Sequence, residues 1–242
     1  MQLKYINREK CAVTKINDLE PLHTFHDFPI FMGCTEKSSE EDLKFNMEWY
    51  ISKSSGLIQL KKLIPLEILY PESHGSGLVG SLWNQHHFEF SEYINEVNNF
   101  KNILEIGGAH GLLANNYLTK NKNSKWTIIE PNPSVENNNI TVIKDFFNEK
   151  FKVINNFDLI VHSHVLEHIY DPDQFIRYLS EYMFIGQRLI FSIPNMKEML
   201  KRKYNNCLNF EHTVFIDEPY LKYLFYKYGF EIIDKKYFKE DH

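Results

Sequence analysis

The stretch that most constrains how this chain folds is Asn102 to Gly111, which reads NILEIGGAHG. Its first half has the continuous apolar pattern of a buried strand, and its second half is a turn of small residues before a helical stretch. Parallel α/β sheets bind nucleotides at such units, because a turn with few side chains lets backbone N–H groups and the next helix approach a ligand. A purely structural tight turn is the alternative.

The spacing within this turn separates two kinds of nucleotide site. Glu105, Gly107, Ala109 and Gly111 lie at i, i+2, i+4 and i+6. This resembles motif I of the class I S-adenosylmethionine (SAM) dependent methyltransferases, an acidic residue followed by G-x-G-x-G, with Ala109 where the middle glycine usually stands. The dinucleotide pattern G-x-G-x-x-G would need glycine at positions 109 and 112, and Leu112 occupies the second. The resemblance therefore implies SAM rather than a nicotinamide cofactor.

Two acidic residues follow at the ends of later predicted strands. Lys125 to Glu130, KWTIIE, ends in a carboxylate about 20 residues after the glycines, where an acid can accept both ribose hydroxyls of an adenosine. Asp145 stands where relatives hydrogen-bond the adenine amino group, although it also fits a loop carboxylate. The cofactor residues that the resemblance implies are Glu105, Gly107, Gly108, Ala109, Gly111, Glu130, Asp145, Phe146, His162 and Ser163.

From residue 101 onward, short β-rich runs alternate with helical stretches, which is typical of a doubly wound α/β sheet. The order resembles the Rossmann-like class I methyltransferase fold. The chain stops directly after the sixth predicted strand, so we expect either an edge strand from the N-terminal segment or a shorter sheet. The predicted strands are 101–107, 125–130, 140–143, 157–162, 187–193 and 230–238, and the predicted helices are 112–120, 171–184 and 217–228.

Residues 1–98 differ from this pattern, with few glycines before Gly75 and several aromatic and histidine-rich patches. We predict an N-terminal cap or substrate subdomain over 1–98 and a SAM-binding domain over 99–242. Segments 19–34 and 65–90 resemble the N-terminal region of bacterial sugar C-methyltransferases, which carry a zinc module with paired cysteines. Here Cys11 and Cys34 stand alone, and tetrahedral zinc needs four ligands, so the module is degenerate.

Three residues are candidates for contact with the substrate. In the resembling families a W-x-x-H segment begins a helix that leads into motif I and faces cofactor and substrate, which implies this position for Trp83 and His86. A packed tryptophan beside a satisfied core histidine is the alternative. Asn195 ends the segment Ile193 to Asn195, which repeats the family pattern after the fifth strand.

Asp158 to Pro172, DLIVHSHVLEHIYDP, resembles the H-x-L-E-H-x-x-D-P segment that follows the fourth strand in many small-molecule methyltransferases. If residues 164–168 form a helical turn, His164, Glu167 and His168 share one face. We expect the loop of His212, in NFEH, to reach the same edge of the sheet. Imidazoles and a carboxylate at this spacing are ligands for a divalent metal.

This cluster can be interpreted in two ways, as a metal site or as a hydrogen-bonded network without metal. Small-RNA 2'-O-methyltransferases are similar in holding a divalent ion with E-x-x-E-H and a later histidine, and here His164 replaces the first glutamate. That change would shift the preference from magnesium toward manganese, iron or zinc. The alternative is a hydrogen-bonded network without metal in which one histidine is the general base: His164 first, then His212, with His168 as the third candidate.

Both mechanisms suit a hydroxylated substrate, because an alcohol is a poor nucleophile until a base or a metal removes its proton. The resemblance to sugar methyltransferases, without the large C-terminal domain of the C-methylating ones, implies O-methylation of a sugar, nucleotide-linked and destined for a surface polysaccharide. An N- or C-methyltransferase acting on another small molecule, or an inactive SAM-fold partner protein, remains open.

Composition limits the other functional classes. The chain has 242 residues with 27 basic and 32 acidic side chains and a formal charge of -5, so no nucleic-acid footprint is evident. It has no apolar run near the roughly 18 residues that a membrane span needs, and no signal-peptide pattern at Met1 to Arg8. Three cysteines disfavour a disulfide framework. We expect a cytoplasmic protein, and the sequence leaves a homodimer open.

Overall fold

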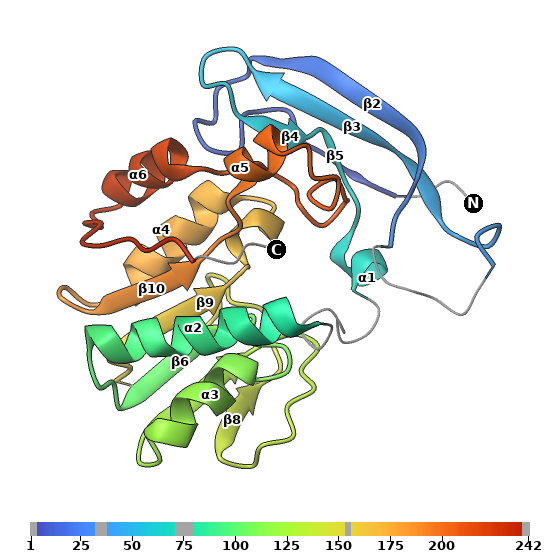
Figure 1. Ribbon diagram of the computed structural model, residues 1–242. Helices are drawn as coiled ribbons and strands as arrows, with labels where there is room; N and C mark the ends of the chain where they lie inside the picture. The colour runs from blue at the N-terminus through green and yellow to red at the C-terminus, as the bar shows by residue number, and fades with distance from the viewer. Residues whose placement is uncertain (1–3, 32–37, 71–79, 153–155, 239–242) are drawn as a thin grey trace. The chain divides into compact units, whose positions relative to one another are not determined.

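The computed structural model describes residues 4–31, 38–70, 80–152 and 156–238 (Figure 1). Its internal contacts divide the chain into two compact units. The parallel unit comprises Glu72–Val165, Glu181–Ile193 and Ile233–His242, and the antiparallel unit comprises Met1–Pro71, Leu166–Ser180 and Pro194–Ile232. Cys34 and Gly75 lie outside the described residues.

The parallel unit contains a five-stranded sheet in the order β10-β9-β6-β7-β8, and all its neighbouring strands are parallel. Apolar runs form these strands because a central parallel strand is buried on both faces. The last four residues of β6 and the first four of β9 are buried accordingly. The five strands confirm the first five predicted ones: β6 (Asn102–Ile106), β7 (Lys125–Ile129), β8 (Ile140–Ile143), β9 (Leu159–Ser163) and β10 (Arg188–Ser192).

Two helices, α2 (Ser81–Val97) and α3 (Leu112–Lys120), share one core with this sheet. On α2 the buried residues His86, Phe90 and Ile94 recur every four positions, which places them on one face of the helix. The helix α3 begins where the glycine turn ends, as the sequence predicts. The shared core consists of Phe90, Ile94, Phe100, Ile103, Leu113, Ala114, Tyr117, Trp126, Ile128, Ile140, Leu159, Val161 and Ile190.

The antiparallel unit is built on a sheet in the order β2-β3-β4, with a second pair β1-β5. Its strands are β1 (Ile6–Asn7), β2 (Leu19–Pro29), β3 (Lys44–Ser52), β4 (Ile58–Leu60) and β5 (Lys62–Leu63). Its helical segments are α1 (Leu66–Leu69), the 3₁₀ turn Leu166–His168, most of α4 (Pro172–Tyr182), α5 (Met196–Lys201) and α6 (Glu218–Lys227). The predicted helices 112–120, 171–184 and 217–228 are therefore present as α3, α4 and α6.

The core of this unit joins its sheet to the later segments. Trp49 stacks on Phe215 with ring centroids 4.7 Å apart. Arg8 is buried and donates to the carbonyls of Thr213, at 2.8 Å, and Tyr170, at 2.7 Å. Residues from the two ends of the chain thus form one unit, which the sequence did not predict.

The predicted strand at 230–238 is wrong, because these residues form no strand in the structure. Ile233 is 67% exposed and Tyr237 is 65% exposed, and among the apolar side chains of 233–238 only Phe238 packs against the core of the parallel unit. Apolar alternation specifies a strand only where a neighbouring strand can pair with it.

Of the two alternatives that the sequence left open, an N-terminal edge strand or a shorter sheet, the described part of the chain shows the shorter sheet. The strands of residues 1–98 pair with one another, and the parallel sheet contains none of them. The helix α2 belongs with the parallel unit, although it precedes residue 98. The division into domains at 98 stays a prediction.

Candidate active site

The glycine turn follows β6 directly, and Gly107 has a backbone that other residues rarely adopt. Its φ is +75°, and its N–H donates to the Ile129 carbonyl at 2.9 Å. A Cβ at this position would lie 2.7 Å from Val165 Cγ2. Both the left-handed φ and the lack of space therefore require glycine.

Glu105 supports this turn from inside the core. Its carboxylate is buried and accepts a hydrogen bond from Trp126 Nε1 at 2.8 Å. A Cβ on Gly108 would lie 2.8 Å from Glu105 Cδ and 2.9 Å from Ile128 Cγ2. The small residue at 108 thus lets the turn lie directly over the carboxylate. The structure places Glu105 beneath the turn, with its side chain 3% exposed overall.

This burial predicts a pH effect on stability. Burial, with a contribution from the charge of Glu130, raises the pKa of Glu105 to about 7. Between pH 4.5 and 7 the folded chain then holds a proton that the unfolded chain has lost, so the free energy of unfolding falls as pH rises through this window. A shift of this size corresponds to a loss on the order of 3 kcal/mol.

We expect the variant Glu105→Gln to lack this dependence, because its amide stays neutral and its oxygen can still accept from Trp126. Its urea midpoint should match the wild type near pH 5 and exceed it near pH 8. Glu136→Gln, at an exposed site, should follow the wild type at both values. Parallel curves for wild type and Glu105→Gln would contradict the shift.

The other predicted adenosine residues follow the neighbouring strands. Glu130 comes directly after β7, is partly exposed, and accepts a hydrogen bond from the Asn132 N–H at 3.0 Å through Oε1. Asp145 and Phe146 follow β8 and are exposed. The glycine turn, Glu130 and Asp145 therefore lie at the carboxyl ends of three adjacent strands, where ligands of open α/β sheets bind.

At the end of β9 the two histidines have different environments. The His162 ring is fully buried and stacks on Phe191 with centroids 4.9 Å apart. Burial and the nearby His164 lower the pKa of His162 to about 3, so this ring stays neutral under ordinary conditions. His164 is partly exposed and has a φ of +51°, and its N–H donates to the Ser192 carbonyl at 3.0 Å. Such backbone strain in a non-glycine residue is common at functional sites.

The side chain of His164 meets two predicted substrate residues from α2. Its ring centroid lies 4.9 Å from that of Trp83 and 4.6 Å from that of His86, both nearly perpendicular. The structure therefore brings Trp83, His86, Ser163 and His164 together in the parallel unit. Ser192 belongs to the same group, since its hydroxyl contacts His86 and Ser163. The sequence did not indicate this serine, although it immediately precedes the pattern Ile193 to Asn195.

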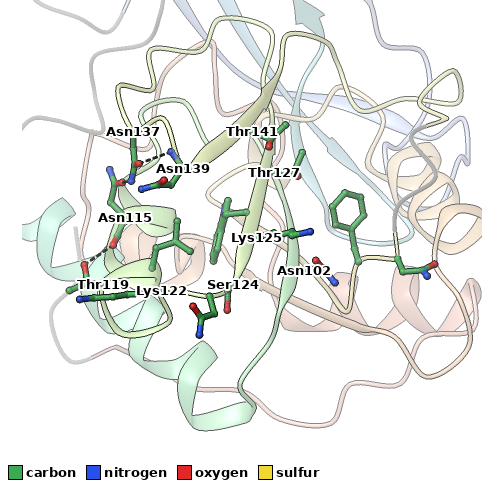
Figure 2. Close-up of a pocket in the computed structure, with 15 residues that line it drawn as sticks. Asn102, Asn115, Thr119, Lys122, Ser124, Lys125, Thr127, Asn137, Asn139 and Thr141 are labelled. Carbon is green, nitrogen blue, oxygen red and sulfur yellow. Dashed lines mark hydrogen bonds between the residues drawn. The ribbon is translucent and has the colours of Figure 1, made fainter.

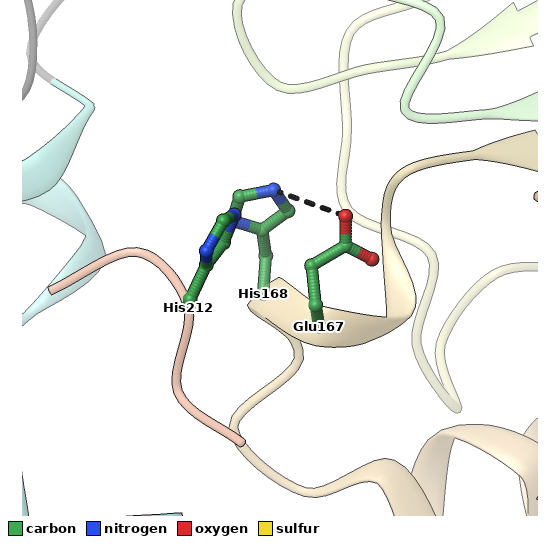
Figure 3. Close-up of side chains that lie close together, drawn as sticks. All are labelled: Glu167, His168 and His212. Atoms are coloured by element: carbon green, nitrogen blue, oxygen red, sulfur yellow. Dashed lines mark ion pairs between the residues drawn. The ribbon is translucent and has the colours of Figure 1, made fainter. Parts of the chain in front are cut away.

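In the antiparallel unit, Glu167, His168 and His212 form the group of side chains that fits a metal ion within the described residues (Figure 3). Their candidate ligand atoms all lie within 4.8 Å of one another, and His168 Nε2 is 3.8 Å from Glu167 Oε1. The condition that residues 164–168 form one helical turn is not met: the 3₁₀ turn starts at Leu166, and His164 precedes it with a left-handed backbone. His164 is not part of this group.

Backbone carbonyls orient both imidazoles of this group. His168 Nδ1 lies 3.1 Å from the Glu211 carbonyl, and His212 Nδ1 lies 3.2 Å from the Cys207 carbonyl and 3.2 Å from Asn209 Nδ2. At His168 the carbonyl only accepts, so Nδ1 donates to it and Nε2 keeps a lone pair. At His212 the donor Asn209 Nδ2 and the acceptor carbonyl of Cys207 both face Nδ1. Burial lowers the pKa of His168, which favours the neutral form of its ring. Two imidazoles and a buried carboxylate at these distances suit a divalent ion.

Asn195 has a structural role in the antiparallel unit. It is exposed, and its Oδ1 accepts from the Glu198 N–H at 3.2 Å, which caps α5. A role in substrate binding stays a prediction.

A cavity of about 900 Å³ lies elsewhere in the parallel unit (Figure 2). Asn102 and Lys125, the first residues of β6 and β7, line it, so it lies at the opposite ends of the strands from the glycine turn. Asn137 donates to Asn115 Oδ1 at 2.7 Å across its wall. This cavity is separate from the candidate active site.

A family model described as a methyltransferase domain matches residues 84–235 of this chain. The chain belongs to this methyltransferase family. With the five-stranded parallel sheet, the match confirms the prediction of a class I methyltransferase domain.

Solved structures show the same fold in distant relatives. A dimethyltransferase of N,N-8-amino-8-demethyl-D-riboflavin from Streptomyces davawensis is 17% identical over 63% of this chain and 50% of its own, with a TM-score of 0.51. A candidate O-methyltransferase from Nostoc punctiforme PCC 73102 is 16% identical over 62% of this chain and 51% of its own, with a TM-score of 0.50. The chain thus spans about half the length of these structures.

No curated protein matches the chain in sequence. Among the described residues, no helix is both long enough and apolar enough to cross a membrane.

Proposed function

We propose that this methyltransferase transfers the methyl group of SAM to a hydroxyl group of a sugar, specifically a nucleotide-linked sugar used for a surface polysaccharide. The observation that carries the hydroxyl acceptor is the position of His164, a partly exposed imidazole that directly follows Ser163 at the carboxyl end of β9, where the hydroxyls of Ser163 and Ser192 lie 2.9 Å apart. The sugar itself rests on the resemblance of segments 19–34 and 65–90.

The residues of the parallel unit fit SAM. Gly107 leaves no side chain where the turn leaves β6, and the turn leads into the N-terminus of α3, where backbone N–H groups favour a polar ligand. Glu130 has one carboxylate oxygen on the Asn132 N–H and a second oxygen available for ribose hydroxyls. When bound, SAM supplies a methyl group on an electron-poor sulfonium.

His164 has the chemistry for the proton step of this reaction. The acceptor hydroxyl must lose its proton as the new O–CH₃ bond forms, and a neutral imidazole takes such a proton near pH 7. The contacts with Trp83 and His86 hold the ring in one orientation. Proximity and orientation of the reacting groups supply much of the rate of such an in-line transfer.

We also propose that Glu167, His168 and His212 hold a divalent ion of the manganese, iron or zinc type. Support comes from their mutual distances and from the backbone carbonyls that face Nδ1 of both rings. Such an ion lowers the pKa of a bound hydroxyl or water.

The test measures the transfer of labelled methyl groups from SAM to a panel of nucleotide sugars. Amines and carbon nucleophiles are tested in parallel as alternative acceptors. We expect label in a sugar product as a base-stable ether. Transfer to amines alone would replace the proposal with N-methylation. Intact SAM binding with no transfer to any acceptor would favour an inactive partner protein.

Glu130 gives a prediction specific to the cofactor. Glu130→Gln should weaken binding of SAM and of its product S-adenosylhomocysteine by about 10- to 100-fold, because it removes a charged acceptor of ribose hydroxyls. Isothermal calorimetry measures the loss, and NAD should bind neither protein. The exposed Glu136→Gln in the same connection is the matched control. Equal affinities in Glu130→Gln and Glu136→Gln would remove Glu130 from the cofactor site.

A further inference from the structure

His86 is a buried imidazole whose ring nitrogen faces two hydroxyls. It is 5% exposed, and its Nε2 lies 3.0 Å from Ser163 Oγ and 3.2 Å from Ser192 Oγ. The two hydroxyl oxygens are 2.9 Å apart, so the three atoms form a closed triangle. Since a buried polar group is costly unless it is hydrogen-bonded, this triangle fixes all three side chains.

The ring of His86 is also held from several sides. Ring centroids of Trp83, Phe90 and Phe238 lie 5.9, 6.0 and 5.1 Å from its own. On a further side its ring meets that of His164 at 4.6 Å with an interplanar angle of 85°. His86 is thus a fixed element between the core of the parallel unit and the partly exposed His164.

The proton count shows what this arrangement presents to a ligand. A ring nitrogen carries either one lone pair or one proton, and each serine has one hydroxyl proton. If Nε2 accepts, the two hydroxyl protons are used within the triangle, and the serines offer lone pairs outward. If Nε2 donates, one hydroxyl proton is left over and points outward. In either state His86 decides how the partly exposed serine pair meets a ligand.

We propose that His86 is a positioning residue: its ring holds the imidazole of His164, and its Nε2 orients the hydroxyls of Ser163 and Ser192 toward the acceptor. This inference rests on the proposed function, with His164 as the base. A hydroxyl acceptor both donates and accepts hydrogen bonds, so it fits a serine pair whose orientation is fixed from beneath. The role differs from that of a core histidine, which would affect stability alone.

Two substitutions separate the two parts of this role. His86→Phe keeps a ring against His164 but loses the nitrogen, so the acceptor KM should rise about tenfold while kcat changes less than about threefold. His86→Gln keeps a polar group near the serines but loses the ring, so kcat should fall about tenfold or more. His87→Phe, the same change one residue along α2, is the matched control: its ring lies 5.3 Å from that of His86 and phenylalanine keeps a ring there, so both constants should stay within about twofold.

A double-mutant cycle tests whether His86 acts through the serines. Ser192→Ala should raise the acceptor KM as His86→Phe does, and the double variant should be no worse than either single variant, because both remove the same contact. Additive effects would overturn this part of the proposal. The variants are assayed at a temperature at which calorimetry shows that they bind S-adenosylhomocysteine as tightly as the wild type does. If both His86 variants lose this affinity at every temperature, the positioning role of His86 is overturned.

A readout without substrate distinguishes failure of this inference from failure of the proposed function. In the free protein, the ring ¹H–¹⁵N signals of His164, assigned with His164→Ala, should shift in His86→Phe and His86→Gln and stay in place in His87→Phe. If no sugar is methylated but these signals shift, the proposed acceptor is wrong and the positioning by His86 stands. Unchanged His164 signals, together with wild-type kcat and KM in both His86 variants, would overturn the inference.

Discussion

Replacing Gly107 with valine is expected to abolish binding of SAM and S-adenosylhomocysteine. The substitution has two independent costs. A β-branched residue is strained at a φ of +75°. Its Cβ would also lie 2.7 Å from Val165 Cγ2, and the short, branched side chain of Val165 has little freedom to move away. The turn must therefore move from the position in which its backbone meets the cofactor. Calorimetry with S-adenosylhomocysteine measures the loss directly.

Two other glycines separate strain from lack of space. Gly186 has a φ of +87°, and no atom lies within 4 Å of the place that a Cβ would take, so Gly186→Ala carries strain alone. Gly108 has no left-handed φ, but its Cβ would lie 2.8 Å from the Glu105 carboxyl carbon, so Gly108→Ala carries the clash alone. We expect cofactor binding to survive in Gly186→Ala and to weaken at least about tenfold in Gly108→Ala. Undiminished affinity in Gly107→Val would exclude this turn as the cofactor site.

The parallel sheet could be predicted from the sequence because its information is local. Each of β6, β7 and β9 is a short run of mostly apolar residues bounded by polar or glycine-rich segments, and burial on both faces requires such runs. The segment 230–238 also contains apolar residues, among them Ile232 and Ile233, but forms no strand. Whether an apolar run becomes a strand depends on a partner edge that the run itself does not encode.

The antiparallel sheet could not be predicted for a related reason. All residues of β2 are exposed or only partly buried, so the strand lacks the alternation that marks a half-buried strand. Its pairing with β3 links Leu19 to Ser52 and Pro29 to Lys44, and the register shifts twice between them. Such irregular pairing leaves no periodic signal in the sequence.

The sequence indicated which residues are candidates for the site, but not how deeply each is buried or which side chains it contacts. The H-x-x-E-H spacing indicated both His164 and His168, but the left-handed backbone of His164 and the start of the 3₁₀ turn at Leu166 put them in different units. Likewise, His162 and His164 look equivalent in the sequence, and only the structure shows that the first ring is buried. The contacts of His86 with Ser163 and Ser192 join three segments that are far apart in the chain.

The histidines give the second large expected effect, a loss of methyl transfer of about 10²- to 10⁴-fold in His164→Ala with cofactor affinity unchanged. This is the result if His164 is the general base, since its removal leaves the acceptor hydroxyl protonated during transfer. The rate profile of the wild type should then fall on the acidic side, where a protonated imidazole cannot accept the proton, and the variant should lack this limb. A chelator should leave this mechanism unaffected.

A metal mechanism predicts a different set of results. Glu167→Ala, His168→Ala and His212→Ala should then each lose both bound metal and turnover, because the site has three protein ligands and the loss of one removes most of its affinity. Chelator should stop the reaction, and manganese, iron or zinc should restore it. Elemental analysis of the purified protein and its three variants measures occupancy independently of activity. Full activity in His164→Ala and His212→Ala, with no metal in the wild type, would contradict both mechanisms and leave these side chains with structural roles.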